Sequence, residues 1–364
     1  MTSTIALAAI AMHRMAGGLE RNLAYLANDL AEAGHRVVVM TFDPPGAEAF
    51  YPLDPRVHWE RLDGRPHAPI TMTGRLALIG RMRRALLAHD VRQIVCFHHG
   101  LLIRYLIASL GLGVRMICSE RNALDLYRFT STPRLNLNYL ALRLADRVTV
   151  QFPRYADAYP AAVRARISVV HNPVWPTTLP PRPRKPVILS VGRHSKQKRF
   201  GMLIRAFAEL AAEFPSWSLC IIGDGPYLEE VRQLAADLGV ADRVTFLGPT
   251  SDVAEHMAEA TLYCQPSEWE GFPNALAEAM ANGAVPVGFA DTAGVRDLIR
   301  HDLDGHLVEG PPDASSLSAG LRHMMRATDL QQRSEQARTI VDRYSVSSWR
   351  AAWRSVLGLA RAGA

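Results

Sequence analysis

The chain has 364 residues, of which 48% are hydrophobic and 21% are charged, as in an ordinary soluble globular protein. This length predicts two domains, because a single domain usually has about 100–200 residues. Its apolar runs are interrupted well before the ~20 residues of a membrane helix, and no basic residue precedes the apolar amino end. We therefore expect no transmembrane helix, no secretory signal and a cytoplasmic location.

Positive charge is concentrated in the first half of the chain. Residues 1–175 contain 21 Arg, no Lys and 13 acidic residues, a net charge of +8, whereas the remainder has a net charge of −2. Such a bias favours anionic partners: phosphorylated substrates, nucleic acid or an acidic membrane surface. A solvated, arginine-rich surface without a partner is the alternative.

Short β-rich runs alternate with helical patterns through the first half. Such alternation is typical of a parallel sheet with helices on both faces, so residues 1–174 are predicted to form one doubly wound, Rossmann-like domain. The β-rich runs are residues 4–12, 35–42, 93–99 and 114–120, and a clear helical pattern covers 19–34.

A proline-rich segment separates the two halves. Residues 175–186, WPTTLPPRPRKP, contain five prolines and no periodic pattern, which predicts a linker. The alternation then restarts, so residues 185–345 are predicted to form a second Rossmann-like domain. Its strands are expected at 187–193, 218–226, 243–248, 261–267 and 284–290, and its helices at 200–214, 227–239 and 272–283.

The carboxyl-terminal segment 346–364 is predicted to be a helix that packs back on the first domain. Trp349, Trp353 and Leu357 recur at helical spacing and form an apolar stripe that needs a surface to cover it. The fold class is thus α/β, with two doubly wound domains that face each other across a cleft. Ligands of such folds bind at the carboxyl ends of the strands.

The stretch PSEWEGFPNALAEAMANG, residues 266–283, predicts an anion site where a loop becomes a helix. Pro273 suits the first helical position, and the free amides that follow can bind a phosphate. Glu270 precedes the helix and Glu278 lies within it. Two carboxylates at different levels can each accept hydrogen bonds from the hydroxyls of one ligand, although a cap and a solvated glutamate would give the same pattern.

Two further segments add groups that suit a diphosphate. Arg193 and Lys198 lie in VGRHSKQKRF, where a predicted strand ends and a helix begins. Gly17 and Gly18 lie between the first strand and its helix, where the backbone can approach a ligand closely. The spacing G-x-G-x-x-G is absent, which argues against a dinucleotide cofactor.

These motifs, in this order, resemble family 4 of the retaining glycosyltransferases, which have the GT-B fold. The resemblance is strong from Val187 to Val308, and its most specific part is Glu-x7-Glu in EGFPNALAEAM. It implies that Glu278 binds the ribose, Glu270 the donor sugar, and Arg193 and Lys198 the diphosphate. It also implies that the donor phosphates lie near Gly17 and Gly18 and near the backbone of Phe272, Pro273, Asn274 and Ala275.

The first domain departs from the commonest pattern of that family. Many relatives have a histidine near the donor sugar, whereas this chain has CSERN, with Glu120, Arg121 and Asn122. Subgroups that build lipid-linked oligosaccharides have similar segments, which implies a place for Glu120 and Arg121 at the reaction centre and for Asn122 near the acceptor. His98 and His99 end another predicted strand and are candidates for acceptor contacts, with a purely structural role as the alternative.

No metal or organic cofactor is expected. Asp302-Leu303-Asp304 has the form of a metal-binding Asp-x-Asp motif, but the segment resembles the family's turn before its last strand, with Gly305 as the turn residue. Four widely spaced cysteines in apolar stretches suggest buried thiols, not a disulfide framework or a zinc site. They are Cys96, Cys118, Cys220 and Cys264.

The resemblance implies transfer of a hexose or N-acetylhexosamine from a nucleotide diphosphate sugar, with UDP expected, to a glycan or polyprenyl-diphosphate-linked oligosaccharide. A sugar-nucleotide 2-epimerase is the alternative enzyme, and it would convert the donor without an acceptor. A nucleic-acid-binding module is the non-enzymatic alternative, but the arginine-rich segments lack interleaved aromatic residues.

One basic helical pattern, residues 74–89, predicts a peripheral contact with anionic lipid at the inner face of the cytoplasmic membrane. One face could be apolar, because Leu76, Ile79 and Met82 or Arg83 recur near helical spacing, with Leu86 and Leu87 beyond, and another face could be basic. A helix that packs on its own sheet would show the same pattern. The basic residues are Arg75, Arg81, Arg83 and Arg84.

Overall fold

The computed structural model of the chain describes residues 4–14, 17–64, 71–124, 136–180 and 182–359. The chain divides into two compact units, Met1–Val170 with Ala351–Ala364, and His171–Arg350. The linker thus belongs to the second unit, because Arg182 and Arg184 are bound there by Glu255 and by backbone carbonyls. Among the described residues, no helix is both long and apolar enough to cross a bilayer.

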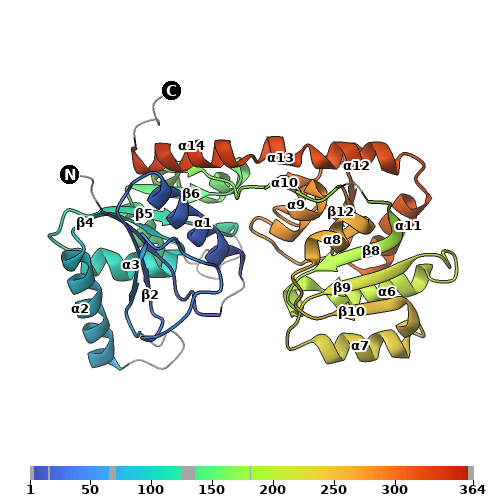
Figure 1. Cartoon of the computed structure of the whole chain (residues 1–364), viewed down its shortest axis with the longest axis horizontal. Coiled ribbons are helices and arrows are strands. Elements are labelled where there is room, and N and C mark those ends of the chain that lie inside the picture. The colour runs from blue at the N-terminus through green and yellow to red at the C-terminus, as the bar shows by residue number, and fades with distance from the viewer. Residues whose placement is uncertain (1–3, 15–16, 65–70, 125–135, 181, 360–364) are drawn as a thin grey trace. The chain divides into compact units, whose positions relative to one another are not determined.

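The first unit is built on a parallel sheet (Figure 1). Its strand order is β3-β2-β1-β4-β5-β6-β7. The order reverses between β1 and β4, where Leu7 pairs with Val95. Three of these strands, the short strands β3, β6 and β7, were not predicted. The strands are β1 Thr4–Ala8, β2 Val37–Thr41, β3 His58–Arg61, β4 Val91–Cys96, β5 Arg115–Ser119, β6 Arg147–Val150 and β7 Ile167–Val169.

Helices flank this sheet, and α2 shows how their apolar sides are used. Its buried residues are Leu78, Met82, Ala85 and Leu86, whereas Leu76 is 66% exposed. Of the residues predicted for the apolar face, Met82 and Leu86 are buried but Leu76 is not, so the buried face begins at Leu78. The helices are α1 Gly18–Glu32, α2 Met72–Ala88, α3 His99–Ala108, α4 Leu137–Leu144 and α5 Ala161–Arg164, with a 3-10 helix η4 at Pro153–Ala158.

The second unit contains a parallel sheet with strand order β10-β9-β8-β11-β12-β13. Here the order reverses between β8 and β11, where Ile188 pairs with Leu262. Both sheets are thus doubly wound, which confirms the predicted fold class, while the cleft between the domains stays a prediction. The strands are β8 Lys185–Val191, β9 Ser218–Ile222, β10 Val244–Leu247, β11 Ala260–Gln265, β12 Val285–Phe289 and β13 His306–Val308.

The core of the second unit lies where its helices cover this sheet. Phe207 of α6 and Leu321 of α11 are fully buried against Ile221 and Val287 of the strands. The helices are α6 Phe200–Leu210, α7 Leu228–Asp237, α8 Val253–Glu259, α9 Asn274–Ala281, α10 Val295–Leu298, α11 Ala314–Arg326, α12 Leu330–Arg338 and α13 Ile340–Arg343, with 3-10 helices η5 Lys196–Lys198 and η6 Ala241–Arg243.

The last helix, α14 Val346–Leu357, runs from the second unit into the first (red in Figure 1). Trp349, Trp353 and Leu357 are each at most 3% exposed, and the Trp353 ring lies 6.1 Å from that of Phe97, just after β4. The end of the predicted helix, residues 360–364, lies outside the described residues. All four cysteines are free and buried, as predicted.

Candidate active site

In each unit, most of the predicted site residues lie in loops that follow a few strands. These strands lie at or beside the point in the sheet where the strand order reverses. In the second unit, Arg193 and Lys198 follow β8, and Glu270 follows β11. In the first unit, Gly17 follows β1, while His98 follows β4. Loops after such neighbouring strands diverge and leave room for a ligand, so the topology places the two groups where doubly wound folds bind ligands.

Two glycines hold the loops after β8 and β9 against each other. The amide of Gly192 donates to Ile222 O, and that of His194 donates to Asp224 O, both at 2.9 Å. A Cβ at Gly223 would lie 2.1 Å from Gly192 O, and one at Gly225 would lie 2.4 Å from His194 O. The GDGP segment therefore needs glycine, because only glycine permits this backbone contact.

Lys198 and Glu270 form an ion pair at the centre of the second-unit group. Lys198 Nζ lies 2.6 Å from Glu270 Oε1, and the side chains are 17% and 9% exposed. Gln265 Nε2 donates to the same carboxylate at 2.9 Å, and Tyr263 Oη donates to Gln265 Oε1 at 3.0 Å. Gly192 makes room for the lysine, since a Cβ there would lie 3.0 Å from Lys198 Cε.

Arg193 and His194, which follow β8, differ in their exposure. Arg193 is exposed, and it has no hydrogen bond or ion pair with any residue that the structure describes. His194 is 1% exposed, and neither ring nitrogen has a hydrogen-bond partner among the described residues. Burial lowers the pKa of His194, with Asp224 opposing and Arg232 adding to the effect, so its ring is neutral near pH 7.

The helix of the predicted anion site, α9, begins at Asn274, and Pro273 is its N-cap instead of its first residue. No side chain caps this end, so the amides of Asn274 and Ala275 have no acceptor within the helix. Phe272 is 6% exposed and packs edge-on against Tyr344, with ring centroids 5.4 Å apart. This contact holds the turn before α9 in place. The free amides at the start of α9 are suited to an anion.

Glu278 lies in the second turn of α9 and is partly buried. The carboxylates of Glu270 and Glu278 both act on buried Tyr263. Burial raises the pKa of that phenol well above its usual value, and the two negative charges raise it further.

In the first unit, Glu120 forms a buried cluster with His99 and Cys118. Glu120 is 1% exposed, its Oε2 lies 3.2 Å from His99 Nδ1, and the Cys118 thiol donates to Oε1 at 3.3 Å. Burial alone would raise the pKa of Glu120, but the hydrogen bond and charge of His99 outweigh it and lower that pKa. Glu120 is thus a carboxylate whose first role is to orient His99.

His98 and Arg121 lie around this cluster. Gly100 N donates to His98 Nδ1 at 3.0 Å, so a neutral His98 carries its proton on Nε2. Burial lowers the pKa of His98, the His99 charge adds to this shift, and Glu120 opposes it. Burial also lowers the pKa of Arg121 to about 10, against the effect of Glu120, so the guanidinium stays charged at pH 7. Asn122 is half-buried in the next position.

Gly17 is the N-cap of α1, and Gly18 is the first residue of that helix. A Cβ at Gly17 would lie 2.1 Å from a carboxylate oxygen of Glu20, so this side chain lies directly against the glycine. Burial raises the pKa of Glu20, although a backbone hydrogen bond lowers it, and the charge of Asp43 raises it further. The sequence analysis missed Glu20, which places a carboxylate at an expected phosphate position.

The sequence analysis also missed Gly192 and Gln265. Gln265 is a polar residue at the last position of a buried strand, which was an available signal for a site residue. Gly192 gave no such signal, because its role depends on the path of a side chain six residues further on. A cavity of about 560 Å³ adjoins this region, and its walls include His194, Lys196, Arg199 and Tyr227.

The two aspartates of the Asp-x-Asp segment have different surroundings. Asp304 is fully buried and accepts hydrogen bonds from Arg300 at 2.6 Å and from Arg343 at 3.2 Å. Asp302 is 56% exposed and lies near His301, His306 and Arg333. Asp304 therefore joins the end of α10 to α13, which is a structural role.

Comparisons with known proteins identify both halves of the chain. Residues 17–173 match the family model described as "Glycosyl transferase 4-like domain", and residues 174–339 match "Glycosyl transferases group 1". An uncharacterized glycosyltransferase of Haemophilus influenzae is 25% identical over 348 residues, which cover 94% of this chain and 96% of the relative.

A Campylobacter jejuni enzyme is 34% identical over 138 residues, which cover 38% of this chain and 37% of its own length. Its name is N-acetylgalactosamine-N,N'-diacetylbacillosaminyl-diphospho-undecaprenol 4-alpha-N-acetylgalactosaminyltransferase.

Solved structures resemble this chain over nearly its whole length. HepE of Anabaena, solved with UDP and glucose, has a TM-score of 0.79 at 21% identity and covers 98% of this chain and 99% of its own. WaaG, a glycosyltransferase of lipopolysaccharide biosynthesis, has a TM-score of 0.72 at 19% identity, with coverages of 97% and 100%. With two family models that together span residues 17–339, the chain belongs to family 4 of the glycosyltransferases, which have the two-domain GT-B fold.

Proposed function

We propose that this glycosyltransferase is a retaining enzyme that moves a hexose or N-acetylhexosamine from a UDP-sugar to a sugar hydroxyl. The acceptor that we propose is a glycan or a polyprenyl-diphosphate-linked oligosaccharide. The observation that carries the proposal is the Lys198–Glu270 ion pair beside exposed Arg193 and the uncapped start of α9. Cations and amides there suit a diphosphate, while the carboxylate suits hydroxyls.

In the proposed mechanism, the diphosphate contacts Arg193, Lys198 and the α9 amides, and Glu278 accepts hydrogen bonds from the ribose. The bond between the sugar C1 and the phosphate oxygen breaks, and the acceptor oxygen bonds to C1 on the same face. The leaving phosphate takes the acceptor's proton. The growing charge on the phosphate is stabilised by the two cations and the helix start, an effect that can be worth several kcal/mol.

The same groups make the proposed reaction independent of a metal ion. Two side-chain cations and a helix start neutralise a diphosphate in the way that Mg²⁺ does in other transferases. In the first unit, we propose that His98 and Asn122 bind the acceptor, and that Arg121 is a reaction-centre residue. Glu120 and His99 would then position these groups.

We propose UDP as the nucleotide of the donor because HepE was solved with UDP and glucose. We propose a lipid-linked acceptor because the name of the Campylobacter relative includes a diphospho-undecaprenol-linked sugar. Incubation of the enzyme with a panel of UDP-sugars and GDP-sugars tests the donor. We expect slow hydrolysis of one UDP-sugar, unchanged by EDTA, with the anomeric configuration retained in the product. Preference for GDP-sugars, an inverted product, or loss of activity that Mg²⁺ restores would each overturn one part of the proposal.

A further inference from the structure

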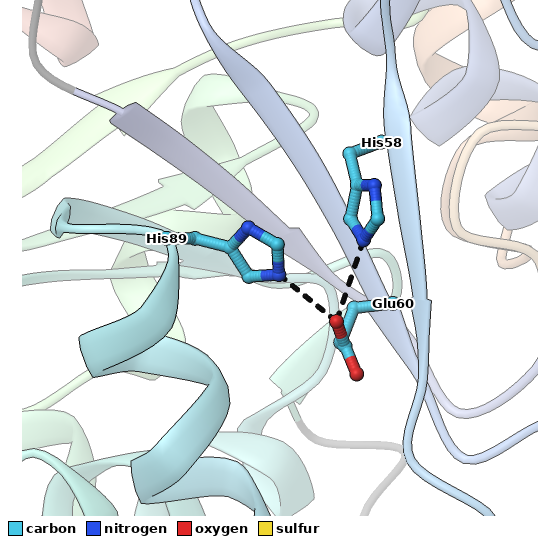
Figure 2. Close-up of side chains that lie close together, drawn as sticks. All are labelled: His58, Glu60 and His89. Carbon is cyan, nitrogen blue, oxygen red and sulfur yellow. Dashed lines mark hydrogen bonds and ion pairs between the residues drawn. The ribbon is translucent and has the colours of Figure 1, made fainter.

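Three side chains of the first unit, outside the candidate active site, direct metal-ligating atoms at one point (Figure 2). His58 and Glu60 lie two residues apart on β3 and so share one face of that edge strand, and His89 is the C-cap of α2. Both Nε2 atoms approach Glu60 Oε2, from His58 at 3.4 Å and from His89 at 2.9 Å.

The spacing of these atoms suits a tetrahedral ion. Zinc–ligand distances of about 2.0–2.1 Å place tetrahedral ligands about 3.3 Å from one another. The two measured distances lie on either side of this value, and all three atoms lie within 4.8 Å of one another. The imidazole rings already lie close, with centroids 4.6 Å apart, so a small rotation completes the geometry.

The surroundings of the three side chains favour a cation. Among the described residues, no Lys or Arg is paired with the Glu60 carboxylate, although the first half of the chain is rich in arginine. His89 ends α2, where the free carbonyls of the helix carry partial negative charge.

A second group of this kind, His301, Asp302 and His306, lacks these properties. His301 Nδ1 accepts a hydrogen bond from Leu307 N at 3.0 Å, so a neutral His301 carries its proton on Nε2, the atom that faces Asp302. Arg333 also lies 3.5 Å from the Asp302 carboxylate. This second group is therefore an internal control.

We propose that His58, Glu60 and His89 bind one zinc ion that ties the edge strand β3 to the end of α2. Two imidazoles and one carboxylate suit zinc, whereas Mg²⁺ and Ca²⁺ prefer oxygen ligands. Since His58 is 56% exposed, a water molecule can occupy the fourth position. The six residues of β4 separate His89 from His98, roughly 20 Å of strand, so the ion has a stabilising role and takes no part in sugar transfer.

Calorimetric titration of the chelator-treated full-length protein with ZnCl₂ tests this proposal. We expect one site per chain, a higher melting temperature with zinc, and the visible absorption of tetrahedral cobalt when Co²⁺ replaces zinc. Glu60→Gln keeps the shape of the side chain and should weaken zinc binding at least a hundredfold, because even outer ligands contribute 10–100-fold.

His58→Ala serves as a second variant, since its exposed side chain can be removed without opening the core. Asp302→Asn is the matched control, and it should leave zinc binding unchanged. The proposal is overturned if the wild type binds no zinc, if binding survives in both Glu60→Gln and His58→Ala, or if only Asp302→Asn abolishes it.

Discussion

Glu270 and Lys198 satisfy each other's charge inside the second unit, and a sugar nucleotide offers partners to both. The lysine can exchange the carboxylate for a phosphate, and the carboxylate can exchange the lysine for sugar hydroxyls. Gln265 supports the Glu270 carboxylate, because it donates a hydrogen bond to Oε1 from the end of β11. The pair therefore presents two adjacent groups of opposite charge at fixed positions.

The first prediction separates the two glutamates. Glu278→Gln should weaken binding of UDP and of the UDP-sugar by roughly 10–100-fold, because a charged hydrogen bond contributes roughly 1.5–3 kcal/mol. Glu270→Gln should reduce turnover and leave UDP affinity nearly unchanged, since its proposed partner is the sugar. Calorimetric titration with UDP and initial rates with the donor measure the two effects. Equal losses of UDP affinity would show that this division of roles is wrong.

The second prediction concerns the cations. Lys198→Met and Arg193→Ala should each lower kcat by on the order of a hundredfold, because both act on charge that grows in the transition state. Lys185→Ala is the matched control, since Lys185 is 61% exposed and pairs with Glu259 instead of Glu270. Turnover at the wild-type rate in either site variant would exclude that cation from the diphosphate site.

The third prediction uses the lowered pKa of His98. Because the folded pKa lies below the unfolded value of about 6.5, the unfolded chain binds more protons as the pH falls. This contribution to stability is complete above that pH and is lost as the pH falls through the folded pKa. His98→Asn keeps a capping side chain for α3 and removes the titration. The melting temperature of the His98→Asn variant should fall less between pH 7.5 and pH 5 than that of the wild type. An identical fall would contradict the lowered pKa of His98.

At the scale of elements, the loops after β8 and β9 act as one unit. Arg193 and Lys198 are presented by the first loop, and the second loop supports it through backbone contacts at Gly223 and Gly225. The start of α9 is built in another way, since Phe272 is packed on Tyr344 and Asn274 accepts a hydrogen bond from Asn172 at 2.8 Å. Neither arrangement depends on an exposed side chain, which suits a site that must keep its geometry.

The fourth prediction tests the loop contact. Gly225→Ala should destabilise the protein more than Gly239→Ala, although both glycines have positive φ. A Cβ at Gly225 meets His194 O at 2.4 Å, whereas one at Gly239 meets nothing within 4 Å. The control should cost only the conformational strain of about 1–2 kcal/mol. Urea unfolding measures the difference, and equal costs would mean that the loops do not need this contact.

At the scale of the whole molecule, the positive charge of the first half is only partly available to a membrane. Arg81 donates to Leu62 O and Asp63 O, and Arg83 donates to Ala108 O and Leu110 O. Among the described residues, Arg75 and Arg84 have no such partners. Met72 and Leu76, which lie near Arg75 in the first turns of α2, are also exposed.

The fifth prediction follows from this distribution of charge. The wild type should bind phosphatidylglycerol vesicles at low salt and be released at high salt, because each Arg near an anionic surface contributes about 1 kcal/mol. The variant Arg75→Glu with Arg84→Glu should bind more weakly and keep its fold, since neither residue holds the fold together. Vesicle flotation measures both. No binding of the wild type at low salt would end the membrane proposal and favour a soluble acceptor.

The sequence by itself determined the two Rossmann-like domains, because buried parallel strands leave apolar runs and their helices leave a period of 3.6. It also determined the family, since Glu270, Glu278, the Arg193–Lys198 loop and GDGP occur in a specific order. It missed the short strands β3, β6 and β7, and it identified only part of the buried face of α2.

Only the tertiary structure decided which side chains meet. The Lys198–Glu270 pair joins residues 72 positions apart, and the His99–Glu120 pair joins two different strand ends. The group of His58, Glu60 and His89 could not be predicted at all, because it depends on an unpredicted strand. Spacing along a chain determines contacts within one helix or strand, whereas contacts between elements depend on strand order and register, which are set by the packing of the whole sheet.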